Sequence, residues 1–199
     1  MDKERMALFP FFRDIKDKTV VVTGTGKEAE SKCAKLAPYG AKIVRMTEDE
    51  FLGNRGTAAQ LADIVPVCII AAGEDREINR RIAVMCRQRG ILVNTVDDPE
   101  YCDFVFPSLI TRGNLSVGIC TGGASPSMGM LLKQKVEEQI PERMEEILDW
   151  LQEVRPVIAE AVPDKKQRFV VFHRLSEMCM RLGRPLTEKE LADLLEIRR

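Results

Sequence analysis

Two glycines separated by one residue have the spacing of a dinucleotide-binding loop. The run Gly24-Thr25-Gly26-Lys27-Glu28-Ala29 fits the pattern G-x-G-x-x-G/A. In that pattern the first glycine permits a tight turn, the second lets the backbone approach a pyrophosphate, and the last small residue keeps helix and strand close. A helix that begins here adds amide donors and positive potential. We expect the coenzyme to contact Gly24, Thr25, Gly26, Lys27 and Glu28. A glycine turn in an α/β domain that binds no nucleotide is the alternative.

The residues about 20 positions further on bear on which coenzyme such a site takes. NAD-binding domains have an acid at the end of the second strand, whereas this chain has Arg45-Met46-Thr47 before Glu48. Arg45 could bind a 2′-phosphate and favour NADP, or it could be a solvated charge at a strand end. Glu48 would suit NAD if the strand extends slightly further. We expect NAD, with NADP left open, and the remaining predicted coenzyme contacts are Arg45, Met46, Ala72 and Asn94.

Two adjacent acids, Asp97 and Asp98, follow another predicted strand in the run Asn94-Thr-Val-Asp-Asp-Pro99. Open α/β sheets bind ligands at the carboxyl ends of their strands. Asp97 could take a proton from carbon or nitrogen of a bound substrate, and burial beside Asp98 would raise one of the two pKa values toward the useful range. Asp97 is therefore the predicted catalytic residue. A turn in which Asp98 precedes Pro99 is the structural alternative.

A second glycine-rich turn, Thr121-Gly122-Gly123-Ala124-Ser125-Pro126, ends a predicted strand and opens a predicted helix. Ser125 is well placed as the N-cap, with Pro126 at the first helical position. The two glycines could equally form a backbone nest that binds anions. This matters if the ligand carries carboxylates.

The elements that must position these residues alternate between strand and helix up to residue 95. Strands are expected at 19–23, 41–46, 67–72 and 91–95, helices at 27–39, 57–64 and 75–89, and a loop at 47–56. The continuous β-branched run Thr19-Val-Val-Val-Thr23 suits a strand covered on both faces, as in a parallel sheet. The order predicts an α/β fold with a doubly wound, Rossmann-type parallel sheet.

The pattern changes after Asp97. Two strands at 104–110 and 115–120 surround a turn, and helices follow at 126–139, 142–160, 165–182 and 187–197. The segment around residues 115–140 is apolar enough to dimerise by strand and helix exchange. We therefore divide the chain into an NAD(P)-binding Rossmann domain at 1–113, a dimerisation segment at 114–141 and an α-helical C-terminal domain at 142–199.

The composition excludes several classes of partner. Lysine and arginine (30) nearly cancel aspartate and glutamate (31), so nothing attracts nucleic acid or an anionic membrane globally. No apolar run approaches the roughly 20 residues of a membrane span, and the N-terminus lacks the apolar segment of a secretory signal. Six scattered cysteines and a single histidine, His173, argue against structural zinc and a disulfide framework. We expect a cytoplasmic protein with no metal site, no nucleic-acid partner and no membrane partner.

Taken together, these motifs resemble those of the precorrin-2 dehydrogenase and sirohydrochlorin ferrochelatase family, also called siroheme synthases. The resemblance runs from about Leu8 to Pro141. Its markers, in chain order, are Leu8-Phe9-Pro10-Phe11-Phe12, the glycine loop followed by Lys32, Ala71-Ala72 through Asn79-Arg80-Arg81, Val93 to Pro99, Cys102 to Pro107, and Thr121 to Pro126.

The resemblance implies an NAD-binding Rossmann domain, a dimerisation segment, a helical domain and a homodimer. The implied reaction removes two hydrogens from precorrin-2 to give sirohydrochlorin, with hydride passing to NAD, on the route to siroheme. Some members also insert ferrous iron. Asp97 would be the family's key aspartate, the proposed base in the oxidation and a participant in metal insertion. Thr121 falls where some relatives have serine.

The chain departs from the family pattern at the glycine loop. The usual glycine triplet appears as Thr23-Gly24-Thr25-Gly26, and Glu28 replaces a small aliphatic residue. A glutamate near a pyrophosphate would repel it unless the side chain points away along the helix. A non-catalytic nucleotide-sensing or tetrapyrrole-handling module is therefore the alternative function.

A tetrapyrrole precursor carries many carboxylates, so it needs a local basic surface despite the neutral total. The candidate cations are Arg80, Arg81, Arg112, Lys133 and Lys135, each of which would also be ordinary as a solvated charge. The predicted substrate contacts are Arg80, Arg112, Thr121, Gly122, Gly123 and Ser125.

Overall fold

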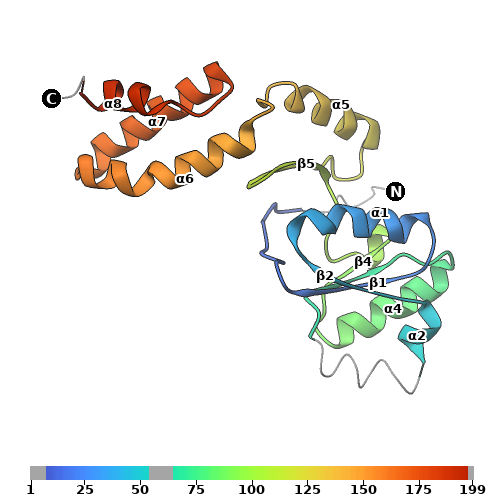
Figure 1. Cartoon of the computed structure of the whole chain (residues 1–199). Helices are drawn as coiled ribbons and strands as arrows, with labels where there is room; N and C mark the ends of the chain where they lie inside the picture. The colour runs from blue at the N-terminus through green and yellow to red at the C-terminus, as the bar shows by residue number, and fades with distance from the viewer. Residues whose placement is uncertain (1–7, 54–64, 197–199) are drawn as a thin grey trace. The chain divides into compact units, whose positions relative to one another are not determined.

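The computed structural model describes residues 8–53 and 65–196 of the chain, which divide into two compact units (Figure 1). The first unit is Leu8–Phe106 and the second begins at Pro107. The short helix expected at 57–64 lies outside the described residues. Each unit is described by itself below.

The first unit is built on a four-stranded parallel sheet of order β2-β1-β3-β4. The strands are β1 (Thr19–Thr23), β2 (Lys42–Met46), β3 (Cys68–Ala71) and β4 (Val93–Thr95). The apolar run Val20-Val21-Val22 of β1 is buried along its whole length, because helices cover both faces of the sheet. The Rossmann-type α/β prediction is confirmed.

The helices of this unit lie on opposite faces of the sheet (Figure 1). Helix α1 (Lys27–Leu36) packs Ala29 and Leu36 against Val20 and Val22. Helices α2 (Glu48–Leu52) and α4 (Arg76–Gln88) pack against the other face, where Val21 and Val93 point. A short 3₁₀ turn, η1 (Ala37–Tyr39), ends α1 at Gly40, whose φ of 67° is left-handed.

The prediction of a loop at 47–56 is wrong, because α2 occupies most of the described part of this segment. Thr47 Oγ1 accepts a hydrogen bond from Glu50 N at 3.1 Å, and the Glu50 carboxylate accepts one from Thr47 N at 2.7 Å. These reciprocal bonds form a capping box, which starts a helix even where the sequence is strongly acidic. The pattern Thr-x-x-Glu was readable in the sequence.

The second unit begins with a hairpin and a helix. Strands β5 (Ser108–Arg112) and β6 (Leu115–Ile119) pair antiparallel, and α5 (Pro126–Glu137) follows. The first of these strands starts four residues later than the expected 104. A domain boundary between 113 and 114 would separate the two strands of this hairpin, whereas the compact units divide at Pro107.

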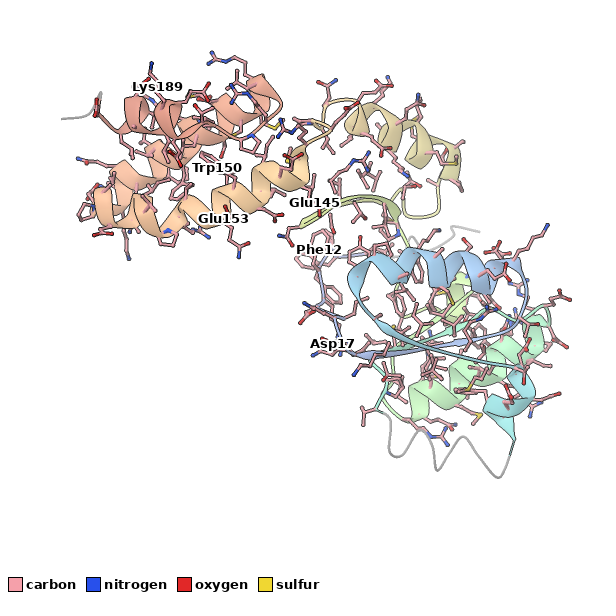
Figure 2. The ribbon with its side chains drawn as sticks, viewed as in Figure 1. Phe12, Asp17, Glu145, Trp150, Glu153 and Lys189 are labelled. Carbon is pink, nitrogen blue, oxygen red and sulfur yellow. The ribbon has the colours of Figure 1, made fainter. Side chains whose placement is uncertain are left out.

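The three remaining helices form the last part of the second unit. They are α6 (Met144–Ala161), α7 (Lys165–Leu182) and α8 (Glu188–Glu196), close to the predicted ranges. Their core contains Ile147, Ile158, Val171 and Leu175, and Trp150 of α6 lies partly buried against it (Figure 2). No described helix is both long and apolar enough to cross a membrane.

Candidate functional site

The glycine loop between β1 and α1 can be formed only by glycine at its first position. Gly24 has a φ of 101°, and a Cβ placed on it would lie 2.5 Å from the carbonyl oxygen of Ala72. Its amide donates a hydrogen bond to the carbonyl of Met46 at 3.0 Å. The loop therefore contacts the ends of β2 and β3, which brings Met46 and Ala72 beside it; their contact with the coenzyme stays a prediction.

Gly26 serves the site in a different way. It is the N-cap of α1 with an ordinary φ of −81°, and a Cβ on it would come no closer than 3.7 Å to another group, Glu74 Oε1. No backbone strain requires glycine here, so its value is the open approach that it leaves to the first amides of α1. A side chain at position 26 would stand in this approach, which is where we expect the pyrophosphate of the coenzyme.

The other residues of the loop are exposed around this approach. Thr25, Lys27 and Glu28 are exposed, whereas Ala29 is buried against the sheet, as close helix–strand packing requires. Glu28 lies near Lys32, one turn further along α1; burial lowers the pKa of that lysine, and the charge of Glu28 acts against this. The glutamate that departs from the family pattern therefore has a cation within electrostatic reach.

Glu48, and not Arg45, lies against the loops at the carboxyl edge of the sheet. Arg45 is an exposed residue within β2, near Cys33 of α1. Glu48 opens α2, and its carboxylate covers Gly73 so closely that a Cβ on that glycine would lie 1.9 Å from Glu48 Oε1. The amide nitrogen of Gly73 in turn lies within 2.9 Å of the position a Cβ on Gly24 would take. Glu48 therefore lies next to the glycine loop.

Asn79 holds this second loop and is a residue whose role the sequence did not reveal. Its side chain, 3% exposed, accepts a hydrogen bond from Gly73 N at 3.0 Å and donates one to Gly73 O at 2.8 Å. A buried amide that pairs with both backbone groups of one residue fixes that residue rigidly. The only signal for it was its place in the marker Asn79-Arg80-Arg81.

Asp97 is exposed in the turn that follows β4, with a left-handed φ of 55°. Cys102 closes this turn from inside: its thiol donates to the carbonyl of Thr95 at 3.1 Å and accepts from the amide of Thr95 at 3.2 Å. Burial raises the pKa of Cys102, so the sulfur keeps the proton that it donates. The turn thus presents Asp97 to solvent at the carboxyl edge of the sheet.

Asn94 shapes the same region from below the surface. Its side chain is 5% exposed, and its Nδ2 donates to the carbonyl of Phe104 at 2.8 Å. This bond holds the segment after the turn alongside β4, which explains why β5 starts later than expected. A coenzyme contact by Asn94 stays a prediction.

Asp98 behaves differently from the sequence-based expectation. Its side chain is 1% exposed, and Oδ2 accepts hydrogen bonds from Arg80 Nε at 2.6 Å and Arg76 Nε at 3.0 Å. The two guanidinium groups outweigh desolvation and lower the pKa of Asp98 to about 2. The prediction that burial would raise one pKa of the pair is therefore wrong for Asp98.

This arrangement predicts an acid-dependent loss of stability. Folding lowers the pKa of Asp98 from 3.8 to about 2. The ionised carboxylate therefore stabilises the folded state at every pH above the unfolded pKa, and this stabilisation is lost as the pH falls toward 2. We expect Asp98→Asn to lower stability at pH 7 and to flatten the decline between pH 5 and 2. Urea unfolding across this range measures it. An acid decline as steep as that of the wild type would contradict the assignment.

Arg80 is engaged within the first unit. Besides Asp98 it pairs with Glu77 at 2.8 Å, and its guanidinium lies 5.2 Å from the ring centre of Tyr101. In the second unit, Arg112 pairs with Glu137 at 2.7 Å. Both predicted substrate cations thus already have carboxylate partners in the described structure, which weakens their case as substrate contacts.

The turn at residues 121–125 closes on itself in the second unit. Thr121 Oγ1 donates to the carbonyl of Ser125 at 3.1 Å and accepts from its amide at 3.3 Å, and Ser125 Oγ accepts from Met128 N at 3.1 Å. Gly122 and Gly123 are both left-handed, with φ of 60° and 80°. The predicted N-cap is confirmed, and binding of substrate carboxylates at this turn stays a prediction.

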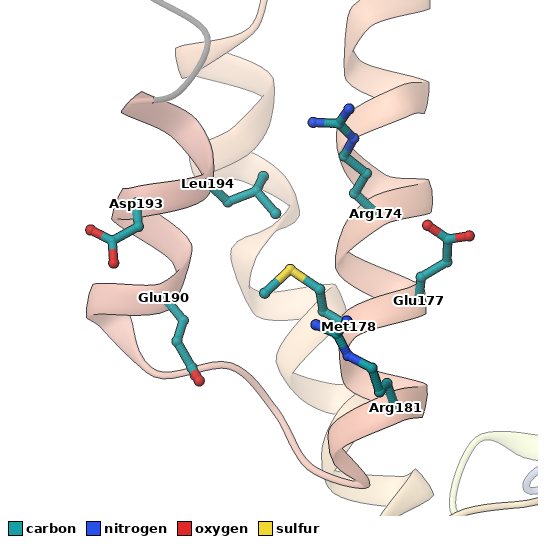
Figure 3. A pocket seen from close by; sticks show the side chains of 7 residues that line it. All are labelled: Arg174, Glu177, Met178, Arg181, Glu190, Asp193 and Leu194. Atoms are coloured by element: carbon teal, nitrogen blue, oxygen red, sulfur yellow. The ribbon is translucent and has the colours of Figure 1, made fainter.

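A hollow of about 600 Å³ lies between α7 and α8, far along the chain from these residues. In Figure 3, Met178 of α7 and Leu194 of α8 lie between the two helices, whereas the carboxylates of Glu177 and Asp193 point to opposite sides, away from each other. Its lining residues are Arg174, Glu177, Met178, Arg181, Glu190, Asp193 and Leu194. Among the residues that the structure describes, no group of three or more His, Cys, Asp or Glu side chains is placed to hold a metal ion.

Comparisons with known proteins find sequence relatives over most of the chain. The sequence model of a family described as NAD(P)-binding matches residues 11–108. Siroheme synthase of Thioalkalivibrio sulfidiphilus is 32% identical over 184 residues, which cover 86% of this chain and 38% of the relative. Siroheme synthase of Zymomonas mobilis is 32% identical, covering 82% and 37%, and siroheme synthase 1 of Pectobacterium atrosepticum is 34% identical, covering 68% and 31%.

A solved structure shares the fold over nearly the whole chain. The structure of SirC, a precorrin-2 dehydrogenase, superposes with a TM-score of 0.68 at 20% identity and covers 95% of this chain and 98% of its own. This chain spans less than half the length of the siroheme synthases it matches. Most of this chain is therefore homologous to a part of the siroheme synthases, and its residues 11–108 match a family described as NAD(P)-binding.

Proposed function

We propose that this chain oxidises precorrin-2 to sirohydrochlorin with NAD as the hydride acceptor. The observation that carries the proposal is that a glycine loop and an exposed aspartate share one edge of one sheet. Gly24 follows β1 and Asp97 follows β4, two strands away in the order β1-β3-β4. Two strand spacings are about 10 Å, a separation that an extended dinucleotide bridges.

The chemistry requires a hydride acceptor and a base. NAD, when bound, supplies the hydride acceptor. Asp97 takes the proton from nitrogen or carbon of the substrate, so that precorrin-2 loses one hydride and one proton in all. Asp97 is exposed at the carboxyl edge of the sheet. A substrate bound at this edge can therefore contact both Asp97 and the coenzyme.

The direct test is turnover. Purified protein is incubated with precorrin-2 and NAD or NADP, and reduced coenzyme is followed by its absorbance at saturating substrate. We expect turnover with NAD. A folded protein, checked by Trp150 fluorescence, that binds coenzyme but gives no turnover would overturn the proposal in favour of a non-catalytic module.

Glu48 supports NAD over NADP, because a carboxylate beside the glycine loop repels a 2′-phosphate and can accept hydrogen bonds from ribose hydroxyls. We expect Glu48→Gln to shift the ratio of kcat/KM for NAD over NADP downward by about tenfold, equivalent to about 1.4 kcal/mol. The same ratio in Glu30→Gln, which alters an exposed acid of α1 outside the predicted coenzyme contacts, is the control. A wild type that prefers NADP and loses that preference in Arg45→Ala would contradict this assignment.

We also propose that the chain acts as a homodimer in the cytoplasm. Helix α5 exposes Met128, Met130, Leu131 and Leu132, with Met130 68% exposed, which supports an apolar partner surface on residues 114–141. All described cysteines are free, as in a reducing compartment. Insertion of ferrous iron into sirohydrochlorin stays a prediction. Incubating the protein with sirohydrochlorin and ferrous iron tests it.

A further inference from the structure

Lys32 occupies a position on α1 where an apolar residue would be expected. The helix buries Ala29 and Leu36 against the sheet, and Lys32 lies three residues after the first and four before the second. Residues at these spacings share one helix face. A lysine turned toward a core is uncommon, because withdrawing an ammonium from water costs free energy unless it finds a partner.

The surroundings of Lys32 are apolar on one side and acidic on the other. Its Nζ lies 4.7 Å from the ring centre of Phe106, which packs against Phe104 with ring centres 5.8 Å apart. Burial, followed by repulsion from Lys35, lowers the pKa of Lys32, while Glu28, Asp97 and Cys102 act to raise it. The ammonium therefore lies within electrostatic reach of the predicted base.

Among the described residues, the Lys32 ammonium has no hydrogen-bond partner and no ion pair within 4.0 Å; it lies over the Phe106 ring. In this it differs from Arg76 and Arg80, whose guanidinium groups both bind Asp98. Contact with an aromatic ring offsets only part of the cost of desolvating a cation. The three donors of the ammonium thus remain available to a ligand beside Asp97.

We propose that the Lys32 ammonium binds a carboxylate of the tetrapyrrole substrate and so holds the substrate against Asp97. This inference rests on the proposed function, because it takes the polycarboxylate substrate from it. A carboxylate also fits the electrostatics: Asp97 and Glu28 alone would repel such a substrate, and Lys32 is a cation within electrostatic reach of both. The ring of Phe106 offers an apolar surface next to that ion pair.

The coenzyme phosphates are the competing anion. They are expected at the first amides of α1, whereas Lys32 lies five residues beyond Lys27, about 7.5 Å along the helix axis. Its electrostatic partners Asp97 and Cys102 belong to the turn after β4. Lys32 therefore belongs to the substrate side of the site.

The test uses the full chain with Lys32→Met, which keeps the length of the side chain and removes the charge. We expect the KM for precorrin-2 to rise about ten- to a hundredfold, as for loss of a charged hydrogen bond, with kcat changed less than about threefold. The dissociation constant for NAD, measured without substrate, should stay within twofold. Lys35→Met, an exposed lysine one turn further along α1, should change none of these, and Lys32→Arg should restore most of the KM.

Two results would overturn the proposal. One is an unchanged KM together with a lowered melting temperature, which would make Lys32 a packing residue of the Phe106 contact. The other is a loss of NAD affinity as large as the change in KM, which would assign the ammonium to the coenzyme.

Absence of turnover in the wild type would instead contradict the proposed function. A second measurement then tests the Lys32 carboxylate site independently of turnover. Uroporphyrin, a stable tetrapyrrole with eight carboxylates, is titrated and followed by its absorption band. Weaker binding by Lys32→Met than by wild type and Lys35→Met would support the carboxylate site. Equal binding by all three would overturn it.

Discussion

An Asp97→Asn variant is expected to bind NAD as tightly as the wild type and to lose turnover by about 10²- to 10⁴-fold, the usual contribution of a general base. The amide has the size of the carboxylate but cannot accept a proton. Asparagine also tolerates the left-handed φ of 55° at this position, so the turn after β4 should keep its shape. Stopped assays of precorrin-2 oxidation and titration of NAD measure the two quantities separately.

Asp17→Asn is the matched control for this variant. Asp17 is the other described non-glycine residue with a positive φ, 59°, and it lies before β1, at the opposite end of that strand from the glycine loop (Figure 2). The substitution should leave turnover unchanged. Turnover by Asp97→Asn within threefold of the wild type would remove Asp97 from the chemistry, and loss of NAD affinity would reassign it to the coenzyme.

Gly24→Ala is expected to have the largest effect on the coenzyme site. An alanine would pay about 1–2 kcal/mol for its left-handed conformation and about 1–3 kcal/mol for pushing its Cβ into a packed wall, since that atom would lie 2.5 Å from Ala72 O. We expect the free energy of unfolding to fall by about 2–5 kcal/mol and NAD binding to be lost. Chemical denaturation and NAD titration measure both.

Two other glycines separate the causes of this effect. Gly90→Ala has the same left-handed requirement, with φ of 67°, but nothing lies within 4 Å of its Cβ, so it should lose only the conformational part and keep NAD affinity. Gly26→Ala should lower stability by less than about 1 kcal/mol, the size of a weakened N-cap, yet reduce NAD affinity by filling the approach to α1. Normal NAD binding by Gly24→Ala and Gly26→Ala would show that the coenzyme lies elsewhere.

Both predictions concern groups at one edge of the sheet, and the neighbouring residues explain why they act separately. Gly24 donates a hydrogen bond to Met46 at the end of β2 and packs against Ala72, just after β3. Asp97 is held by the Cys102 thiol and the turn after β4. A substitution in one turn therefore breaks no hydrogen bond of the other.

The sequence by itself determined the features that depend on short-range pattern. The β-branched run of β1, the spacing of the two glycines and the Ser125 cap each follow from backbone rules that act over a few residues. The same rules placed Asp97 just beyond β4. Helix α2 could have been found in this way as well, because its capping box at Thr47 and Glu50 is local, but the polar, glycine-containing stretch 47–56 favoured a loop.

Only the tertiary structure decided which charged groups are free and which are paired. Arg80 looked like a substrate cation from its helix face, yet it binds Asp98, which comes 18 residues later. Lys32 was only a marker of the family resemblance in the sequence, yet in the structure its ammonium lies over the Phe106 ring, within electrostatic reach of Asp97. Glu48 took its place beside Gly73 because β2 ends at Met46. Desolvation and charge pairing depend on contacts distant in sequence, which no local pattern contains.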